Sequence, residues 1–168
     1  LNVNDPVVQH LPWFDTKNRE DSKKITIEHL LNHSSGLPGR LNVHDIKSLE
    51  REDIVEVIAS KLLNVKLVGE PGEIYEYTNM NTDLLQLIIE EVTGEKFTHY
   101  MEKNIFVPIQ MDRTDYFTHH EQQLENTAIG HRYHWGKLKP YEERLVYATA
   151  GSAGLTSNID DLATFMIS

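Results

Sequence analysis

The sequence has 168 residues, about the size of one domain, and its 39% hydrophobic and 25% charged residues are typical of a globular chain. The 16 basic and 26 acidic side chains give a formal net charge of −10. This charge repels phosphate backbones and anionic lipids, so we expect no nucleic-acid partner and no membrane contact from this segment. The absence of cysteine excludes disulfide bonds and thiolate metal sites.

The first elements are predicted from residues that cap helices. Asp5 precedes a proline, which favours a helix N-terminus, and the apolar residues that follow predict one short turn over residues 7–11. Residues 17–24 are strongly charged, and we expect them to form a solvated loop. Thr26 is a suitable N-cap for a second helix, which residues 34–39, Ser-Ser-Gly-Leu-Pro-Gly, would end.

A polar corner and the clearest helix of the sequence follow one another. Residues 48–63 predict a helix and residues 64–72 a loop. Tyr77 and Asn79 come next, and side chains two apart in an extended or tightly turned backbone project to the same side. We therefore expect a phenol and a carboxamide to converge. Behind them, residues 83–93 have the spacing of an amphipathic helix, with Leu84, Leu85, Leu87, Ile88, Ile89 and Val92 apolar and a glycine where a left-handed C-cap is usual.

The last third of the sequence predicts two helices and a hairpin. Residues 97–108 have helical spacing and end near a proline. Residues 129–141 alternate weakly around Gly136-Lys137, which predicts a small β-hairpin. Residues 157–160, Ser-Asn-Ile-Asp, form a capping box that would start a last helix over residues 161–167.

Four segments together resemble the serine β-lactamase-like superfamily, which includes class C β-lactamases, D-alanyl-D-alanine carboxypeptidases and related esterases. Tyr77-Thr78-Asn79 matches its Tyr-x-Asn motif. Residues 25–38 match Ile-Thr-x-x-x-Leu-Leu-x-His-Thr-Ser-Gly-Leu-Pro at ten or more positions. Residues 105–111 resemble Ile-Phe-x-Pro-Leu-Gly-Met, although Gln110 replaces the glycine, and residues 148–155 resemble Ala-x-Gly-Gly-Leu with Ala153 in place of the first glycine.

The resemblance implies a fold and a site. It implies a mainly α fold with a small β component (α+β), the helical region of the β-lactamase/transpeptidase-like fold, as a single domain over residues 1–168. In such a site Tyr77 would shuttle a proton between the serine nucleophile and the leaving group, and Asn79 would bind the neighbouring lysine and the substrate amide. We expect no cofactor and no metal.

Two motifs of the superfamily are missing from the sequence. None of the serines has a lysine three residues later, so there is no Ser-x-x-Lys, and Lys-Thr-Gly is also absent. His134-Trp135-Gly136 spells the alternative His-x-Gly, but it precedes the glycine-rich segment, and we interpret it as a hairpin turn. The chain therefore resembles the central part of such a protein, and we expect it to be inactive by itself.

Other candidates for catalysis are weaker. Ser34 and Ser35 lack the flanking glycines of a nucleophile elbow, so we interpret them as the hydrogen-bonded end of a helix. His33 is interpreted as a structural hydrogen-bonding residue. A histidine-rich stretch fits no standard zinc spacing; it comprises His119, His120, Glu121, His131 and His134.

The favoured hypothesis is a bacterial serine hydrolase, in the form of a β-lactamase, DD-peptidase or esterase. Its full-length form would bind a small-molecule or peptidoglycan-peptide substrate and act on D-Ala-D-Ala peptides, β-lactams or small esters. The alternative is a non-catalytic binding or scaffold module with the same fold. We also expect an exposed apolar flank that allows a homodimer. The location of the parent protein, in the cell envelope or outside the cell, stays open.

Overall fold

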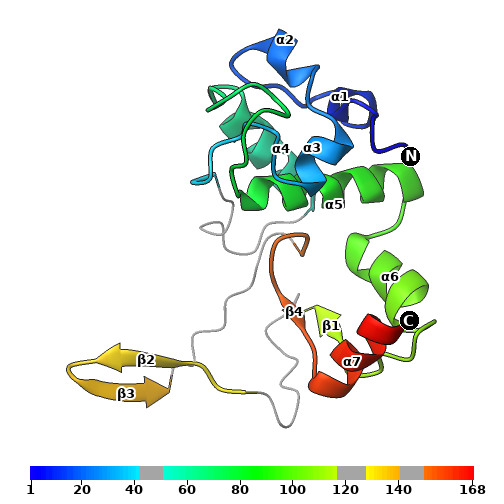
Figure 1. Cartoon of the computed structure of the whole chain (residues 1–168), viewed down its shortest axis with the longest axis vertical. Coiled ribbons are helices and arrows are strands. Elements are labelled where there is room, and N and C mark those ends of the chain that lie inside the picture. Colours follow the sequence, from blue (N-terminus) through cyan, green and yellow to red (C-terminus); the bar gives the residue numbers. More distant parts are fainter. Residues whose placement is uncertain (42–50, 117–127, 141–149) are drawn as a thin grey trace.

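The computed structural model describes residues 1–41, 51–116, 128–140 and 150–168. These residues are mainly helical with two small two-stranded sheets, as predicted (Figure 1). The helices are α1 (Val7–His10), α2 (Arg19–Ser22), α3 (Ile27–Leu31), α4 (Arg51–Leu62), α5 (Asn79–Thr93), α6 (Phe97–Met101), the π-helix η1 (Glu102–Phe106) and α7 (Ile159–Ile167). The strands are β1 (Asp115–Tyr116), β2 (His131–His134), β3 (Lys137–Pro140) and β4 (Leu155–Thr156).

The start of the chain is more helical than the sequence predicted. α1 forms as expected, but its N-cap is Pro6 and not Asp5, whose carboxylate accepts a hydrogen bond from the Asn2 amide at 3.0 Å. The predicted solvated loop contains the short helix α2, because the Asn18 side chain caps it by accepting from the Glu20 amide. Thr26 caps α3 as predicted, accepting from the His29 amide at 3.3 Å.

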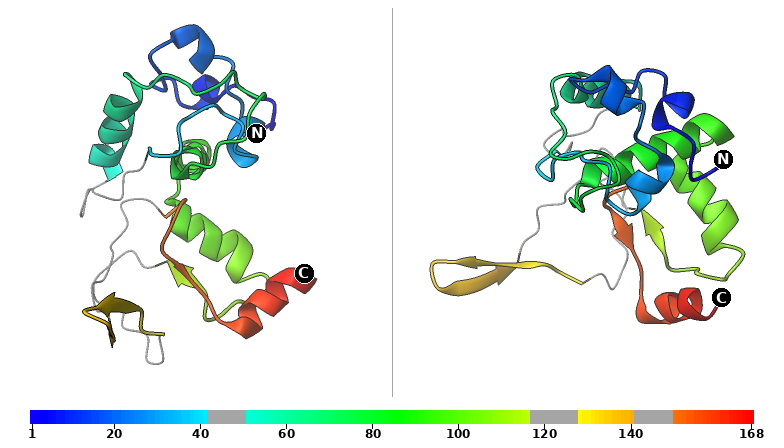
Figure 2. Two further views of the ribbon diagram at one scale, coloured as in Figure 1. Left: turned by 60° about the vertical axis from the view of Figure 1, so that its left-hand side comes forward. Right: turned by 45° about the horizontal axis from the view of Figure 1, so that its top comes forward.

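Helix α5 crosses the centre of the helical region, as two further views show (Figure 2). It begins four residues earlier than predicted, because Thr78 is an N-cap whose side chain accepts from the Met80 amide. It ends at Gly94, whose φ of 69° is the left-handed conformation predicted for that cap. Leu84 and Leu87 are buried as expected, whereas Val92 is 49% exposed, because it lies in the last turn beyond the packed part of the helix.

Two clusters of buried apolar side chains lie on either side of this helix. The first joins residues from α1, α3, α4 and α5, among them Val7, Leu30, Ile58 and Leu84, all with no exposed surface. The second is smaller and contains Phe97, Phe106, Met111 and Tyr116. The larger cluster therefore supports the loop that precedes α5, where the predicted site lies.

A left-handed turn and a capped helix lie in the same region as the second cluster. Gln110 adopts a φ of 61°, a left-handed conformation that glycine favours and most side chains avoid. α7 is capped by Asn158, whose side chain accepts from two amides, and not by Ser157, whose hydroxyl bonds instead to Thr114 at 2.7 Å. The first helical residue is therefore Ile159, two residues before the predicted start.

A buried carboxylate joins α7 to the rest of this region. The Asp161 carboxylate accepts from the Thr114 hydroxyl at 2.7 Å and from the Arg113 amide at 2.9 Å. Burial alone would raise the pKa of Asp161, but these two hydrogen bonds and one with Asn158 outweigh it and hold the pKa below its ordinary value. The ionised carboxylate is thus part of the packing.

The predicted hairpin is present and is exposed along its whole length. β2 and β3 pair antiparallel, with Tyr133 opposite Leu138. The turn residues are Trp135 and Gly136, with φ values of 50° and 72°, so the turn lies one residue earlier than Gly136-Lys137. Figure 1 shows the hairpin projecting from the body of the molecule. The interpretation of His134-Trp135-Gly136 as a hairpin turn is confirmed.

Candidate functional site

The loop before α5 is held by a second loop that runs beside it. The amides of Val68, Gly72 and Glu76 donate hydrogen bonds to the carbonyls of Gly36, Ser34 and His33, respectively, at 2.8 to 2.9 Å. Gly36 has a φ of 78°, and a Cβ atom there would overlap the carbonyl oxygen of Gly69. The close backbone approach of the two loops therefore requires glycine at this position.

Tyr77 and Asn79 converge at the end of this loop, as the sequence predicted. The Tyr77 hydroxyl donates a hydrogen bond to Asn79 Oδ1 at 2.9 Å. The Tyr77 side chain is 58% exposed, and Asn79, the first residue of α5, is half-buried. Between them, the buried Thr78 hydroxyl donates to the Leu41 carbonyl at 3.3 Å. A fixed backbone thus presents a phenol and a carboxamide to solvent.

The remaining contacts of the site come from the residues around His33. Asn81 is fully buried, and its Oδ1 accepts a hydrogen bond from the Ser35 hydroxyl at 2.7 Å while its Nδ2 lies 3.0 Å from His33 Nδ1. The His33 ring lies 4.6 Å from the Tyr77 ring and 6.1 Å from the Tyr75 ring, centroid to centroid. The interpretation of His33 as a structural hydrogen-bonding residue is confirmed.

The two serines also have structural roles. Ser35 is fully buried, and its Oγ accepts from the Leu37 amide at 3.2 Å as well as donating to Asn81. Ser34 receives a backbone hydrogen bond from Gly72, and its amide donates to Asn32 Oδ1 at 3.0 Å. Both serines therefore close the end of α3, as the sequence indicated.

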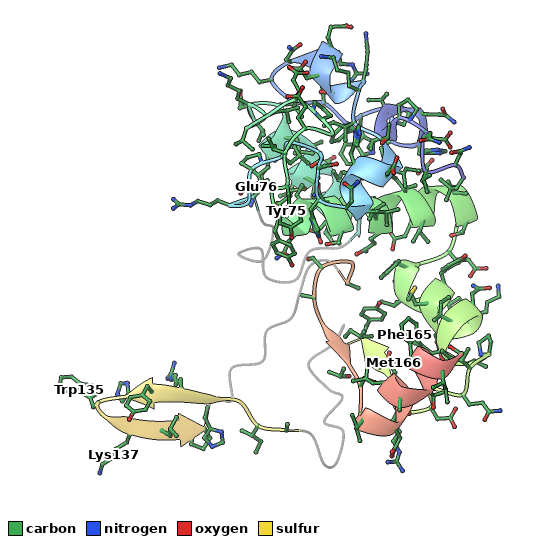
Figure 3. All side chains as sticks on the ribbon, in the orientation of Figure 1. Tyr75, Glu76, Trp135, Lys137, Phe165 and Met166 are labelled. Carbon is green, nitrogen blue, oxygen red and sulfur yellow. The ribbon has the colours of Figure 1, made fainter. Side chains whose placement is uncertain are left out.

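Two residues of the site were not predicted. No sequence pattern identifies Asn81 as a residue of the site, because it is one of several polar residues near the start of the helix. Glu76 was also missed, although its Oε1 accepts from the Gly39 amide at 3.1 Å and so joins the two loops. Figure 3 shows Tyr75 and Glu76 at the edge of the helical region.

An apolar groove of about 360 Å³ lies next to the site and not at it. Leu1, Val3, Leu31, Leu85 and Phe97 contribute much of its apolar lining, and Thr82 and Gly151 also border it. The Thr82 hydroxyl donates to the carbonyl of Asn79 at 2.9 Å. The groove and the Tyr77–Asn79 pair are therefore connected through the first turn of α5.

Metal-ligating residues are not grouped in the part of the chain that the structure describes. No set of three or more histidine, aspartate or glutamate side chains is close enough there to hold an ion. His131 and His134 are on the exposed hairpin, and His131 Nδ1 lies 3.0 Å from the Ile129 carbonyl. His119, His120 and Glu121 lie outside the described residues.

The described residues also include no helix that is both long and apolar enough to cross a bilayer. α5, the longest of these helices, has 15 residues.

Comparison with known proteins decides the family. A family model described as Beta-lactamase matches residues 1–168. The chain belongs to the Beta-lactamase family. This assignment confirms the resemblance on which the sequence-based roles of Tyr77 and Asn79 depend, and the roles themselves stay predictions.

Individual members of the Beta-lactamase family share the fold and part of the sequence. The chain is 34% identical over 131 residues to Protein flp of Staphylococcus aureus (strain MW2), and 32% identical over 142 residues to a penicillin-binding protein of Bacillus subtilis (strain 168). These matches cover 78% and 79% of this chain. An octameric penicillin-binding protein homologue from Pyrococcus abyssi superposes with a TM-score of 0.77 and 26% identity over 99% of this chain.

This Beta-lactamase-family chain corresponds to only part of its relatives. It covers 26% and 29% of the two curated proteins and 38% of the Pyrococcus chain. The chain spans about a quarter of the length of the curated relatives that it matches.

Proposed function

We propose that this chain forms one wall of the acyl-transfer site of a serine hydrolase that acts on D-Ala-D-Ala peptides, β-lactams or small esters. The observation that carries the proposal is the 2.9 Å hydrogen bond between the Tyr77 hydroxyl and Asn79 Oδ1 at the solvent-accessible start of α5. Three comparisons support this reaction class: membership of the Beta-lactamase family, the similarity to a penicillin-binding protein of Bacillus subtilis, and the similarity to a penicillin-binding protein homologue of Pyrococcus abyssi.

In this site the two side chains have different tasks. The Tyr77 hydroxyl transfers a proton between the attacking serine and the leaving group, which requires the phenol to lie within hydrogen-bond reach of both. Asn79 accepts from that phenol with Oδ1, and in the complete site its carboxamide binds the neighbouring lysine and the substrate amide, as the family resemblance implies. A lysine beside the serine would stabilise the phenolate form of Tyr77 during transfer.

The chain by itself lacks the nucleophile motif. Its sequence contains no Ser-x-x-Lys, and the buried, hydrogen-bonded Ser35 does not replace it. We therefore expect the 168-residue chain to hydrolyse neither nitrocefin nor p-nitrophenyl acetate above the buffer rate. Intact-mass measurement after incubation with benzylpenicillin should show no covalent adduct, and an adduct on any serine would refute this expectation.

The role of Tyr77 is testable in the natural protein that contains this chain. Tyr77→Phe removes the proton-transferring hydroxyl, and we expect kcat for its best ester or β-lactam substrate to fall about 10²- to 10⁴-fold. Tyr75→Phe is the matched control, because Tyr75 is 71% exposed and lies two residues away. Equal activity of the two variants would refute the role of Tyr77.

The alternative is a non-catalytic binding module, and the missing Ser-x-x-Lys is the observation that favours it. A binding module would retain benzylpenicillin or a D-Ala-D-Ala peptide reversibly in the natural protein, with saturation in calorimetry and no turnover. Turnover that is lost in Tyr77→Phe would exclude this alternative.

We also propose that exposed apolar side chains on α7 allow a homodimer. Phe165, Met166 and Ile167 are 56%, 84% and 85% exposed, and Figure 3 labels the first two on this helix. Light scattering should give a dimer mass that decreases towards the monomer mass in Phe165→Ser. A monomer at all concentrations would contradict this proposal.

A further inference from the structure

A connected row of polar groups leads from the core to the exposed phenol. Ser35 and Asn81 have no exposed surface, His33 is half-buried, and Tyr77 is 58% exposed. Each member contacts the next: the Ser35 hydroxyl with Asn81 Oδ1, Asn81 Nδ2 with His33 Nδ1, and the His33 ring with the Tyr77 ring. Ser35 and Asn81 are 46 residues apart in the sequence, so the row is a product of the tertiary fold.

The direction of these hydrogen bonds fixes the proton on His33. The Ser35 hydroxyl donates to Asn81 Oδ1, and the amide of Asn81 therefore presents its NH₂ group to His33. Since an amide NH₂ only donates, His33 Nδ1 must accept. In this contact Nδ1 carries no hydrogen, so the ring hydrogen of the imidazole is on Nε2.

A fixed proton position also fixes the orientation of the ring. Rotation of the imidazole by half a turn would place a carbon atom, in place of Nδ1, against the buried NH₂ of Asn81 and leave that donor without its acceptor. A phenylalanine ring at this position would fill the same space, but it is unchanged by a half-turn, so no hydrogen bond would select one orientation. The backbone is fixed too, because His33 has a φ of 58° and its carbonyl accepts from the Glu76 amide.

We propose that His33 is a positioning residue for Tyr77: the row Ser35–Asn81–His33 holds the imidazole in one orientation, and the imidazole sets the phenol towards Asn79. The His33 and Tyr77 rings are 4.6 Å apart and inclined at 45°, and the His33 ring also meets the Tyr75 ring edge to face at 81°. The effect on catalysis rests on the function proposed above, whereas the effect on the position of the phenol does not.

The first test measures the proton on His33 in the 168-residue chain. Long-range ¹H–¹⁵N spectra should show Nδ1 unprotonated and Nε2 protonated. In Asn81→Asp the carboxylate still accepts from Ser35 but now also accepts from the ring, so the hydrogen should move to Nδ1. Asn104→Asp is the matched control, because Asn104 is exposed and its side chain donates a hydrogen bond to the Tyr100 carbonyl within the described structure. This variant should leave the His33 spectrum unchanged. A wild-type ring protonated on Nδ1 would overturn the proposal without any variant.

The second test measures the position of the phenol. His33→Asn removes the ring but keeps a residue type that tolerates a positive φ. The ring protons of Tyr77 should lose their ring-current shift and their nuclear Overhauser contacts to Asn79. Unchanged shifts and contacts in His33→Asn would overturn the proposal.

Kinetics in the natural protein separate this inference from the proposed function. His33→Asn should lower kcat about 10- to 100-fold with little change in KM, because the misplaced group acts in the transition state. If Tyr77→Phe leaves kcat unchanged, the proposed function is wrong, while the two spectroscopic results still decide whether His33 positions the phenol. If only His33→Asn leaves kcat unchanged, the positioning role in catalysis is wrong.

Discussion

The helical region around α5 and the β2–β3 hairpin differ in the burial of their side chains and in the sequence distance that their contacts span. Leu84 and Ile58 in the helical region have no exposed surface, whereas Tyr133 and Leu138 on the hairpin are 75% and 65% exposed. The helical region is connected across long sequence distances, while the pairing within the hairpin is local. A two-stranded hairpin without apolar packing is only marginally stable by itself, and the candidate site lies in the region where buried contacts support the loops.

The same contrast explains why an exposed side chain can be fixed. Tyr77 is about as accessible as Leu138, but its neighbours His33 and Asn79 are held by the buried Asn81 and by the start of α5. The exposed fraction of a side chain therefore does not show whether it is held in place. The burial of the residues that it contacts does show this.

The largest expected effect on stability tests the two regions with one substitution in each. Leu84→Ala removes a fully buried side chain from the larger cluster and should lower the free energy of unfolding by about 2–5 kcal/mol. Leu138→Ala on the hairpin should change it by less than about 0.5 kcal/mol. Urea denaturation followed by circular dichroism measures both. Equal losses would show that the hairpin is packed against another surface.

The next prediction concerns the contact between α5 and the glycine-rich segment. The Gly151 amide donates to Gln86 Oε1 at 2.8 Å, and a Cβ atom at this glycine would overlap the Thr82 carbonyl oxygen. Gly151→Ala should therefore destabilise the chain by about 1–3 kcal/mol. Gly130→Ala is the matched control, because a Cβ atom there meets nothing within 4 Å. A neutral Gly151→Ala would show that the segment moves away from α5 without cost.

A smaller, stabilising effect is expected at the turn before β1. Gln110 has a φ of 61°, and glycine removes the steric cost of that conformation while adding entropy to the unfolded chain. Gln110→Gly should therefore raise the free energy of unfolding by about 0.5 kcal/mol. Gln9→Gly, within α1, should lower it by about 0.5–1 kcal/mol. Destabilisation by Gln110→Gly would mean that contacts of the glutamine side chain outweigh its backbone strain.

The smallest expected effect depends on pH. Because the pKa of Asp161 is lower in the folded than in the unfolded chain, its carboxylate contributes stability above the unfolded pKa of about 3.9, and this contribution is lost as the pH falls through the folded value. Asp161→Asn should lower the Tm at pH 7, and the difference from wild type should narrow below about pH 4. Thermal scans between pH 7 and pH 2.5 measure it, and a constant difference would contradict the assigned cause.

Local signals predicted the parts of the structure that local interactions determine. The cap at Thr26 and the left-handed Gly94 follow from residues within one turn of the helix end, and both are confirmed. The convergence of Tyr77 and Asn79 followed from their spacing in the same way. α2 was missed because its charged residues suggested a loop, although Asn18 is a helix cap.

Features that depend on contacts between distant residues could not be predicted from the sequence. Asn81 meets Ser35 and His33 across 46 and 48 residues, and no periodicity connects those positions. Val92 was placed on the buried face because its spacing fits, but the packed surface ends one turn earlier. Patterns identify which face of a helix is apolar, and only the assembled fold shows how far along the helix that face is covered.

The two tryptophans of the chain lie one in each of the contrasted regions. The indole of Trp13 is half-buried against the larger apolar cluster, and that of Trp135, at the tip of the hairpin, is 90% exposed. Their fluorescence is therefore a mixture of a shielded emitter and one open to quenchers such as iodide. Replacing Trp135 with phenylalanine leaves an optical probe that reports the core alone, and replacing Trp13 leaves one that reports the hairpin.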